Sequence, residues 1–235
     1  MTRILITGHR GYIGSQLIKE LDAFGLDLVD GNDILTCDLP DADVVIHLAA
    51  QTNVIASVAD PEFDARTNIL GTIRLAKRYK DSHFVFASSG GAIQEKIESP
   101  YGLSKYCAEE YIKMICKNYT ILRFANIFGE GDHGVVNKFI TQPITVYGDG
   151  TSTRNYVYIK DLIRGIIESL DYPKNCTYSF GNEKSVAILE LAKATGKPIT
   201  FLPKIEGELQ HSVVPNNTNW KPTVDVINYI KECTR

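Results

Sequence analysis

Two side chains in the middle of the chain have the types and spacing needed to move a proton. Tyr101 and Lys105 stand four residues apart in Tyr-Gly-Leu-Ser-Lys, at the beginning of a helical stretch. Positions i and i+4 share one face of a helix, so the Lys105 ammonium would stand beside the Tyr101 phenol. A free phenol has a pKa of about 10 and is a poor base at neutral pH, but a nearby cation favours phenolate. The spacing therefore predicts an acid–base tyrosine assisted by a lysine.

Two serines follow the apolar run at 83–87, which is a predicted strand. Ser88 and Ser89 would then lie at the carboxyl edge of a sheet, where open α/β sheets bind their ligands. A hydroxyl at this edge can share a hydrogen bond with a substrate oxygen. A Tyr-x-x-x-Lys pair alone occurs by chance in many helices, so its value depends on this strand and on the glycine loop near the N-terminus.

That loop is Thr-Gly-His-Arg-Gly-Tyr-Ile-Gly at 7–14, between a predicted strand and a predicted helix. The pyrophosphate of a dinucleotide binds at such a helix N-terminus, where backbone N–H groups and the helix dipole favour negative charge. The glycines permit the tight turn, the approach of the phosphates and close helix packing. We therefore predict a dinucleotide site that includes Gly8, Arg10, Gly11, Tyr12, Ile13 and Gly14.

The choice between NAD and NADP depends on the end of the second strand. An acid there holds the adenosine ribose hydroxyls and repels a 2′-phosphate. Asp27 is the first choice for this acid and Asp30 the second. Arg10 argues the other way, because a basic side chain in the loop can meet that phosphate. NAD is favoured, and NADP stays possible.

The elements that must position these residues alternate along the first half of the chain. Continuous apolar strands separated by helices indicate parallel βαβ units covered on both faces. We expect an α/β fold, a Rossmann-type doubly wound parallel sheet with a small interleaved C-terminal substrate-binding region. The predicted domains are 1–125, which binds the dinucleotide, and 126–235. The predicted strands are 3–7, 24–28, 43–49, 83–87, 119–124, 144–147, 156–159, 178–180 and 199–202, and the predicted helices are 12–21, 62–79, 100–118, 161–169, 186–195 and 224–231.

Composition excludes several other classes of protein. Among 235 residues, 25 Lys and Arg against 28 Asp and Glu give a net charge of −3, which argues against a nucleic-acid partner. No apolar run approaches the ~18 residues of a membrane span, and we expect no membrane association. Five cysteines without a CxxC pair are typical of reduced thiols in a cytoplasmic protein, with no metal site.

Taken together, the motifs resemble the extended short-chain dehydrogenase/reductases, in the NAD-dependent epimerase/dehydratase group that acts on nucleotide sugars. The resemblance covers nearly the whole chain. It is carried by TGHRGYIG (7–14), HLAAQ (47–51), NILGT (68–72), FASSGGA (86–92), PYGLSKYCAE (100–109), LRFANIFGEG (122–131), PITVYGDGTSTRNYVYIKDL (143–162), GELQHS (207–212) and NWKP (219–222).

The resemblance implies a role for each matching residue. Ser89, Tyr101 and Lys105 match the catalytic Ser/Thr, the acid–base tyrosine and the lysine, which also binds the cofactor. Further cofactor positions are Asp38 and Leu39 beside the adenine, Leu48, Ala49 and Ala50 at a strand end, and Asn68, which supports the active-site region. The substrate positions are Ser88, Asn126, Arg154 on the diphosphate and Glu208 near the nucleoside ribose.

The chain also departs from the group's pattern. The region 28–43 is compressed, so we expect a strand and a helix to be missing there, and 135–142 is short as well. Gln94 and Glu95 stand where the group usually has Tyr-Gly, and Asn155 replaces an Asp. Gly90 and Gly91 follow the catalytic serine where members that eliminate water carry Asp-Glu, which argues against 4,6-dehydration.

Three functions follow from these observations. The first is a nucleotide-sugar 4-epimerase that acts on a UDP- or dTDP-hexose through a transient 4-keto intermediate. The second is an NAD(P)H-dependent reductase of a nucleotide-linked 4-keto sugar, and the third is a non-catalytic dinucleotide-binding module. The resemblance also implies a homodimer paired through the helix 100–118, for which Tyr111, Ile112 and Ile115 are candidates unless they face the core.

Overall fold

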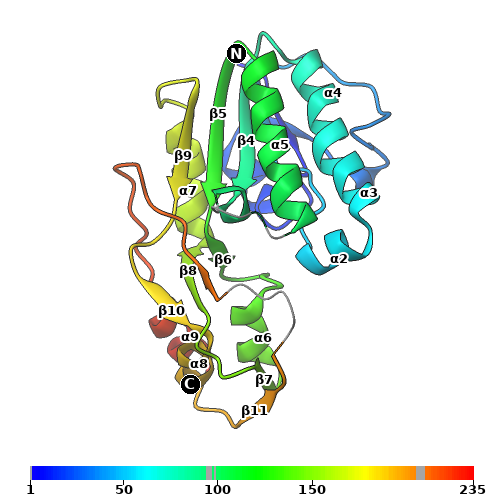
Figure 1. Cartoon of the computed structure of the whole chain (residues 1–235). Coiled ribbons are helices and arrows are strands. Elements are labelled where there is room, and N and C mark those ends of the chain that lie inside the picture. Colours follow the sequence, from blue (N-terminus) through cyan, green and yellow to red (C-terminus); the bar gives the residue numbers. More distant parts are fainter. Residues whose placement is uncertain (1, 94–96, 98, 205–209) are drawn as a thin grey trace. The chain divides into compact units, whose positions relative to one another are not determined.

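Six strands of the chain form one sheet in a computed structural model that describes residues 2–93, 97, 99–204 and 210–235 (Figure 1). In spatial order they are β2 (Ala23–Leu26), β1 (Ile4–Thr7), β3 (Val44–His47), β4 (His83–Ser89), β5 (Asn118–Phe124) and β9 (Cys176–Phe180). β2, β1, β3 and β4 run parallel to their neighbours. The predicted Rossmann-type parallel sheet is therefore confirmed.

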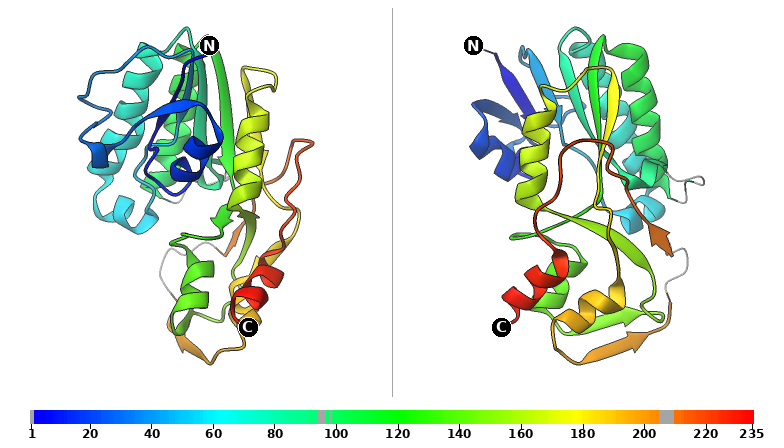
Figure 2. Two further views of the ribbon diagram at one scale, coloured as in Figure 1. Left: turned by 180° about the vertical axis from the view of Figure 1, so that it is seen from behind. Right: turned by 90° about the vertical axis from the view of Figure 1, so that its left-hand side faces the viewer.

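Helices cover both faces of this sheet (Figure 2). α4 (Gly71–Arg78) and α5 (Pro100–Ile115) lie on one face, and α1 (Gly14–Glu20) lies on the other. Successive strand residues point to opposite faces, so each buried strand contributes apolar side chains to both layers.

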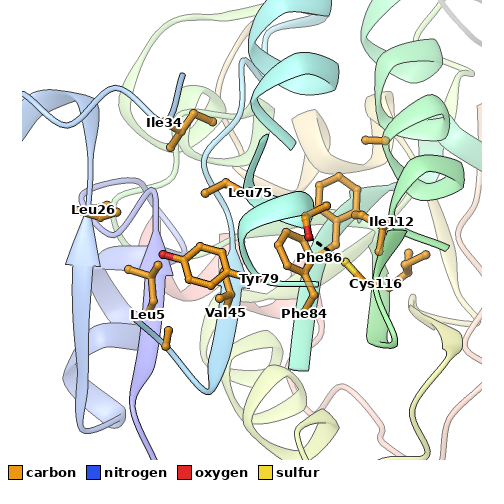
Figure 3. Close-up of a cluster of buried hydrophobic side chains, with 14 residues drawn as sticks. Leu5, Leu26, Ile34, Val45, Leu75, Tyr79, Phe84, Phe86, Ile112 and Cys116 are labelled. Atoms are coloured by element: carbon orange, nitrogen blue, oxygen red, sulfur yellow. Dashed lines mark hydrogen bonds between the residues drawn. The ribbon is translucent and has the colours of Figure 1, made fainter. Parts of the chain in front are cut away.

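The core between the sheet and the α4 and α5 layer is shown in Figure 3. Each fully buried apolar side chain there contributes roughly 1.5–3 kcal/mol relative to an exposed one. Together they fix α5, and with it Tyr101 and Lys105, against β4. The core includes Leu5, Leu26, Ile34, Val45, Leu75, Tyr79, Phe84, Phe86, Ile112 and Cys116.

Strand register decides which loops meet at the carboxyl edge. Thr7 pairs with Leu26 on one side and with His47 on the other, and His47 pairs with Phe86. The residues that follow these strands therefore begin at one edge of the sheet. This edge carries the glycine loop, the acids after β2, the chain after β3 and the two serines that end β4.

The connection between β2 and β3 is as short as the sequence predicts. It contains one 3₁₀ turn, η1 (Leu28–Asp30), and no strand or α-helix between residues 27 and 43. β2 consequently forms the edge of the sheet. The missing strand and helix are confirmed.

The segment before α4 is more complicated than predicted. The single helix expected at 62–79 is divided into α3 (Pro61–Ala65), a π-helical turn η2 (Arg66–Leu70) and α4. A further helix, α2 (Val54–Ala59), was not predicted, because three of its apolar side chains are exposed and give no buried stripe. π turns occur frequently at functional sites.

The chain divides into two compact units. Unit 1 comprises Met1–Arg123 and Ile166–Tyr178, and unit 2 comprises Phe124–Gly165 and Ser179–Arg235. The division predicted at 125 and 126 stays a prediction.

Unit 2 is built around β8 (Thr153–Tyr158). β10 (Ser185–Ala187), β12 (His211–Ser212) and β6 (Asn126–Phe128) pair with it, and β11 (Ile199–Leu202) pairs with β7 (Ile144–Tyr147). α6 (Val135–Thr141), α8 (Ile188–Ala194) and α9 (Val226–Cys233) pack together over a core of Phe128, Val136, Phe139, Tyr156 and Leu191. The predicted helix at 161–169 corresponds to α7 (Ile159–Ser169).

Within the described residues, none of the helices is long and apolar enough to cross a membrane. The cytoplasmic location stays a prediction.

Candidate functional site

The glycine loop has the geometry that a bound pyrophosphate requires. Gly8 adopts φ +75°, and a Cβ there would lie 2.6 Å from the backbone nitrogen of Ala49. A Cβ on Gly14 would lie 2.2 Å from the Gly8 carbonyl oxygen. These two glycines let the turn pack against the chain after β3 and against α1. At Gly11 a Cβ would approach one atom alone, the Gly8 oxygen at 3.2 Å, among the described residues. The outer side of the loop is thus open to a ligand, and the residues present fit a dinucleotide.

The acids after β2 are tied to this loop in different ways. Asp27 accepts hydrogen bonds from the backbone N–H groups of Arg10, at 2.9 Å, and Val29, at 3.0 Å. Asp30 receives the Arg10 guanidinium, with an Nη2–Oδ1 distance of 2.7 Å. A carboxylate accepts about four hydrogen bonds, so Asp27 keeps acceptor capacity for ribose hydroxyls. The arrangement favours Asp27 as the ribose ligand.

The remaining cofactor candidates divide into two groups. Leu48, Ala49 and Ala50 are half-buried and follow β3 directly beside the glycine loop. Asp38 is exposed, and Leu39 packs against the core cluster. Tyr12 and Ile13 are half-buried between the loop and α1.

α5 begins at the site because its N-terminal signals are strong. The Ser99 side chain accepts a hydrogen bond from the Gly102 N–H at 3.1 Å, and Pro100 occupies the first helical position. Tyr101 follows in the first turn, and its N–H donates to the Ser57 hydroxyl at 3.2 Å. The positive end of a helix stabilises negative charge, so this position suits a phenolate.

Burial raises the pKa of the Tyr101 phenol, and the Ser89 hydroxyl lowers it by hydrogen bonding. The Asp64 carboxylate adds to the rise. The protein alone therefore holds Tyr101 as a neutral phenol, and a cation beside it is needed for ionisation. Ser89 and Tyr101 are thereby brought together in the folded chain.

Lys105 is 4% exposed on the buried face of α5. Its Nζ lies 4.3 Å from the centroid of the Phe86 ring, a cation–π contact. Burial lowers the pKa of Lys105 to about 8, against the attraction of the Glu109 and Asp64 carboxylates. An ammonium has three N–H donors, which suit the hydroxyls of a ribose.

The loop after β4 is packed directly on the first turn of α5. This loop is a 3₁₀ turn, η3 (Gly90–Ile93), and the Gly91 N–H donates to the Ser89 hydroxyl at 3.2 Å. A Cβ on Gly102 would lie 2.9 Å from the Gly91 oxygen. A side chain at Gly102 would therefore push the loop that carries Ser89 away from the first turn of α5, whereas a Cβ on Gly91 would lie 3.5 Å from its nearest neighbour. Gln94 and Glu95 lie outside the described residues.

Ser88 belongs to a buried charged network that the sequence did not reveal. Its hydroxyl donates to Glu109 at 2.5 Å, and Arg123 grips the same carboxylate at 2.9 and 2.6 Å. Glu109 is fully buried and Ser88 is 4% exposed. The network fixes the end of β4 to α5 and β5. Its central residue, Glu109, lies four positions after Lys105 in α5.

Asn68 lies in the π turn and ties three segments together. Its Nδ2 group donates to the Gln51 oxygen at 2.9 Å and to the Ser104 hydroxyl at 3.1 Å, while its Oδ1 accepts from the Gln51 N–H at 2.9 Å. The buried Asp64 carboxylate holds both the Gln51 and Asn68 amides, at 2.9 and 3.1 Å. Asn68 therefore supports the chain after β3 rather than presenting its amide outward. Asp64, Gln51 and Ser104 were missed, although Asp64 and Asn68 are four apart on a predicted helix.

His47 is a core residue whose two ring nitrogens both have hydrogen-bond partners. Its Nδ1 lies 2.7 Å from the Thr7 hydroxyl and its Nε2 lies 3.0 Å from the Thr72 hydroxyl. Burial lowers the pKa of His47 to about 3. The neutral ring joins the end of β1 to the beginning of α4.

Two of the other substrate candidates, Asn126 and Arg154, lie in unit 2, whereas Ser88 lies in unit 1. Asn126 is exposed on β6 and donates to the Asn155 carbonyl at 3.2 Å. Arg154, on β8, donates to the Thr153 carbonyl at 2.8 Å. Glu208 lies outside the described residues. Asn155 is buried and donates to the Asn182 and Val214 carbonyls, which explains an amide where the group has a carboxylate.

Comparison with known proteins agrees with this geometry. The family model described as "NAD dependent epimerase/dehydratase family" matches residues 4–180. The chain belongs to this family. It is an enzyme of the NAD-dependent class, and the expected family and cofactor are confirmed.

Individual relatives match along nearly the whole chain. A putative UDP-glucose 4-epimerase of Methanocaldococcus jannaschii is 33% identical, over 99% of this chain and 99% of the relative. The structure of a UDP-glucose 4-epimerase from Thermotoga maritima with UDP-glucose has a TM-score of 0.84 at 26% identity, covering 99% of this chain and 97% of that one. A UDP-glucuronic acid 4-epimerase from Bacillus cereus, solved with UDP-glucuronic acid and NAD, has a TM-score of 0.83 at 27% identity, covering 98% and 99%.

Proposed function

We propose that this protein is an NAD-dependent 4-epimerase of a UDP-hexose. The observation that carries the proposal is the hydrogen bond between Ser89 and Tyr101, one helical turn before Lys105, at the carboxyl edge that also holds the glycine loop. The names of the relatives, two of which are UDP-sugar 4-epimerases in solved structures, support the choice of sugar nucleotide.

Each of the three side chains has a distinct task in this proposal. The Tyr101 oxygen takes the proton of the sugar 4-hydroxyl and later returns it. Ser89 hydrogen-bonds the same sugar oxygen, and Lys105 holds ribose hydroxyls. NAD, which the glycine loop and Asp27 would hold, would supply hydride transfer from and to C4 of the sugar. The cycle consumes no cofactor, because oxidation and reduction cancel.

Two side chains of unit 2 suit a nucleotide-sugar substrate in this proposal. The Arg154 guanidinium suits a diphosphate, to which it can donate two parallel hydrogen bonds. Asn126 offers an exposed amide near it on the neighbouring strand β6, which pairs with β8. Gly90 and Gly91 provide no acid–base pair after Ser89, which favours epimerisation over 4,6-dehydration.

A proton NMR time course tests the proposal. The purified protein with NAD, and with no added reductant, receives UDP-glucose, UDP-galactose and the corresponding dTDP-hexoses. We expect the C4 epimer of a UDP-hexose to accumulate, and Tyr101→Phe to reduce the rate by at least about 100-fold, the lower range for a general acid–base residue. Tyr106→Phe is the matched control, since Tyr106 lies exposed on the same helix.

The other outcomes separate the alternatives. Epimerisation of dTDP-hexoses but not of UDP-hexoses would show that the substrate carries dTDP rather than UDP. No epimerisation, together with oxidation of added NADH or NADPH by a UDP- or dTDP-4-keto sugar, would replace the proposal by the reductase. Tyr101→Phe protein with undiminished turnover would remove Tyr101 from the mechanism. Binding of dinucleotide without either reaction would favour the non-catalytic module.

A further inference from the structure

A charged cluster surrounds the acid at the end of η1. The Arg10 guanidinium donates to Asp30 through Nε, at 3.0 Å, and through Nη2, at 2.7 Å, both to Oδ1; a third distance, Nε to Oδ2, is 3.2 Å. A guanidinium–carboxylate pair with two donors is directional as well as charged. Arg10 is therefore directed toward Asp30, although its position in the loop would also allow it to meet a ribose 2′-phosphate.

His9 holds the other side of the same carboxylate. Its Nε2 lies 3.2 Å from Asp30 Oδ2. The imidazole ring lies directly on β2 at Gly25, where a Cβ would be 2.2 Å from the ring Cγ. The absence of a side chain at Gly25 is thus what lets His9 reach Asp30. The carboxylate is fixed from two sides, and its pKa is lowered mainly by the hydrogen bond from Arg10.

The net charge of the side chains around the ribose position disfavours a 2′-phosphate. Arg10 contributes one positive charge, and Asp27 and Asp30 contribute two negative charges, so these three side chains together carry a net −1. Ribose hydroxyls can donate to Asp27, whose carboxylate is held in place by two backbone N–H groups. A 2′-phosphate would bring further negative charge and would have to take Arg10 away from Asp30.

We propose that Asp30 determines the preference for NAD over NADP by holding Arg10, with His9 and Gly25 setting the position of the carboxylate. Asp30 acts as a positioning residue, since it binds Arg10 and not the cofactor. The proposal depends on the proposed placement of the adenosine ribose beside Asp27. It does not depend on which sugar the enzyme converts.

Binding of NAD and NADP to the protein freed of nucleotide, measured by calorimetry, tests this proposal. We expect the wild type to bind NAD more tightly, and Asp30→Ala and Asp30→Asn to shift the ratio of dissociation constants toward NADP by about 10- to 100-fold. That range corresponds to one charge-assisted hydrogen bond. Asp30→Glu should restore the preference. Asp41→Asn is the matched control, because Asp41 is an exposed aspartate paired with Arg78 at the far end of the sheet.

Further variants show whether Arg10 is the group that is released. Arg10→Ala in the Asp30→Asn background should remove the gain in NADP affinity. An unchanged ratio in both Asp30 variants, or a gain that survives Arg10→Ala, would overturn the proposal. The Asp27→Asn variant distinguishes an error in the role of Asp30 from an error in the placement of the adenosine ribose. If Asp27→Asn leaves NAD binding unchanged, the ribose lies elsewhere; if it weakens NAD binding while the Asp30 variants keep the ratio, the role of Asp30 is wrong.

Discussion

Glu109 is an ionisable residue with no access to solvent, and its partners decide whether its burial is tolerated. Arg123, with its side chain 20% exposed, supplies the compensating charge through two hydrogen bonds. Removing one partner of a buried pair leaves an uncompensated charge, which costs about 3–5 kcal/mol. The pair stabilises the junction of β4, α5 and β5 on which the site is built.

We therefore expect Arg123→Ala to lower the free energy of unfolding by about 3–5 kcal/mol, measured by urea denaturation. Lys117→Ala, which breaks the exposed pair between Lys117 and Asp81, should change it by less than about 1 kcal/mol. Replacing both Arg123 and Glu109 by leucine should recover much of the loss. Equal effects of Arg123→Ala and Lys117→Ala would contradict a stabilising role of the Arg123–Glu109 pair.

Sequence reasoning works well at this scale where chemistry depends on local spacing. Tyr101 and Lys105 share one turn of helix, and Gly8, Gly11 and Gly14 share one loop, so both groups were predicted. Contacts between distant segments carry no local signal. Glu109 with Ser88, and Asn68 with Gln51, became visible only once the strands and helices were placed.

Among the elements, β1 and α4 are joined by a single neutral imidazole. His47 bonds the Thr7 and Thr72 hydroxyls, and its folded pKa of about 3 lies well below the ordinary value of 6.5. Above pH 6.5 both folded and unfolded His47 are neutral. As the pH falls from 6.5 toward 3, His47 becomes protonated in the unfolded chain but stays neutral in the folded protein. The free energy of unfolding therefore decreases in this pH range.

His47→Gln removes this proton linkage. Between pH 7 and pH 5 we expect the wild type to lose about 2 kcal/mol more unfolding free energy than the variant, from the slope of about 1.4 kcal/mol per pH unit. Urea denaturation at both pH values measures the difference. His211→Gln, at an exposed histidine, serves as the control. Parallel pH profiles of wild type and His47→Gln would contradict the burial argument.

Elements with a strong apolar period were predicted, and weak or very short ones were not. The β3, β4 and α5 sequences give clear signals, and their observed bounds differ from the predicted ones by a few residues. No helix was predicted for the residues of α6, which were described only as a short segment. β6, β10 and β12 have two or three residues each, too few for a pattern, and they form because β8 offers them a pairing edge.

For the whole molecule, association of two copies stays a prediction that rests on the family resemblance. The structure narrows the candidates on α5. Ile112 is fully buried and Ile115 packs against the core, so neither is available to a partner, whereas Tyr111 is 42% exposed and Met114 is 78% exposed. Leu103 and Tyr106 are exposed apolar residues on the same helix.

We expect the wild type to sediment as a dimer and the Tyr111→Glu/Met114→Glu double variant as a monomer, because two carboxylates would be buried without partners. Sedimentation velocity measures both. Phe201→Glu, at an exposed apolar position of β11 in unit 2, should leave the dimer intact. A monomeric wild type, or a dimer that tolerates both glutamates, would contradict pairing through α5.

The π turn at Arg66–Leu70 also constrains how this chain can vary in length. An α-helix turns by about 100° per residue. The π turn changes this phase, and in the resulting arrangement Asn68 faces Gln51 while Thr72 faces His47. Losing one residue between them would restore regular α-helical phase and rotate one of the two side chains away from its partner. Homologous sequences can therefore exchange residue types in this stretch more readily than residue number, and an alignment gap placed here would mark a chain that organises the segment after β3 differently.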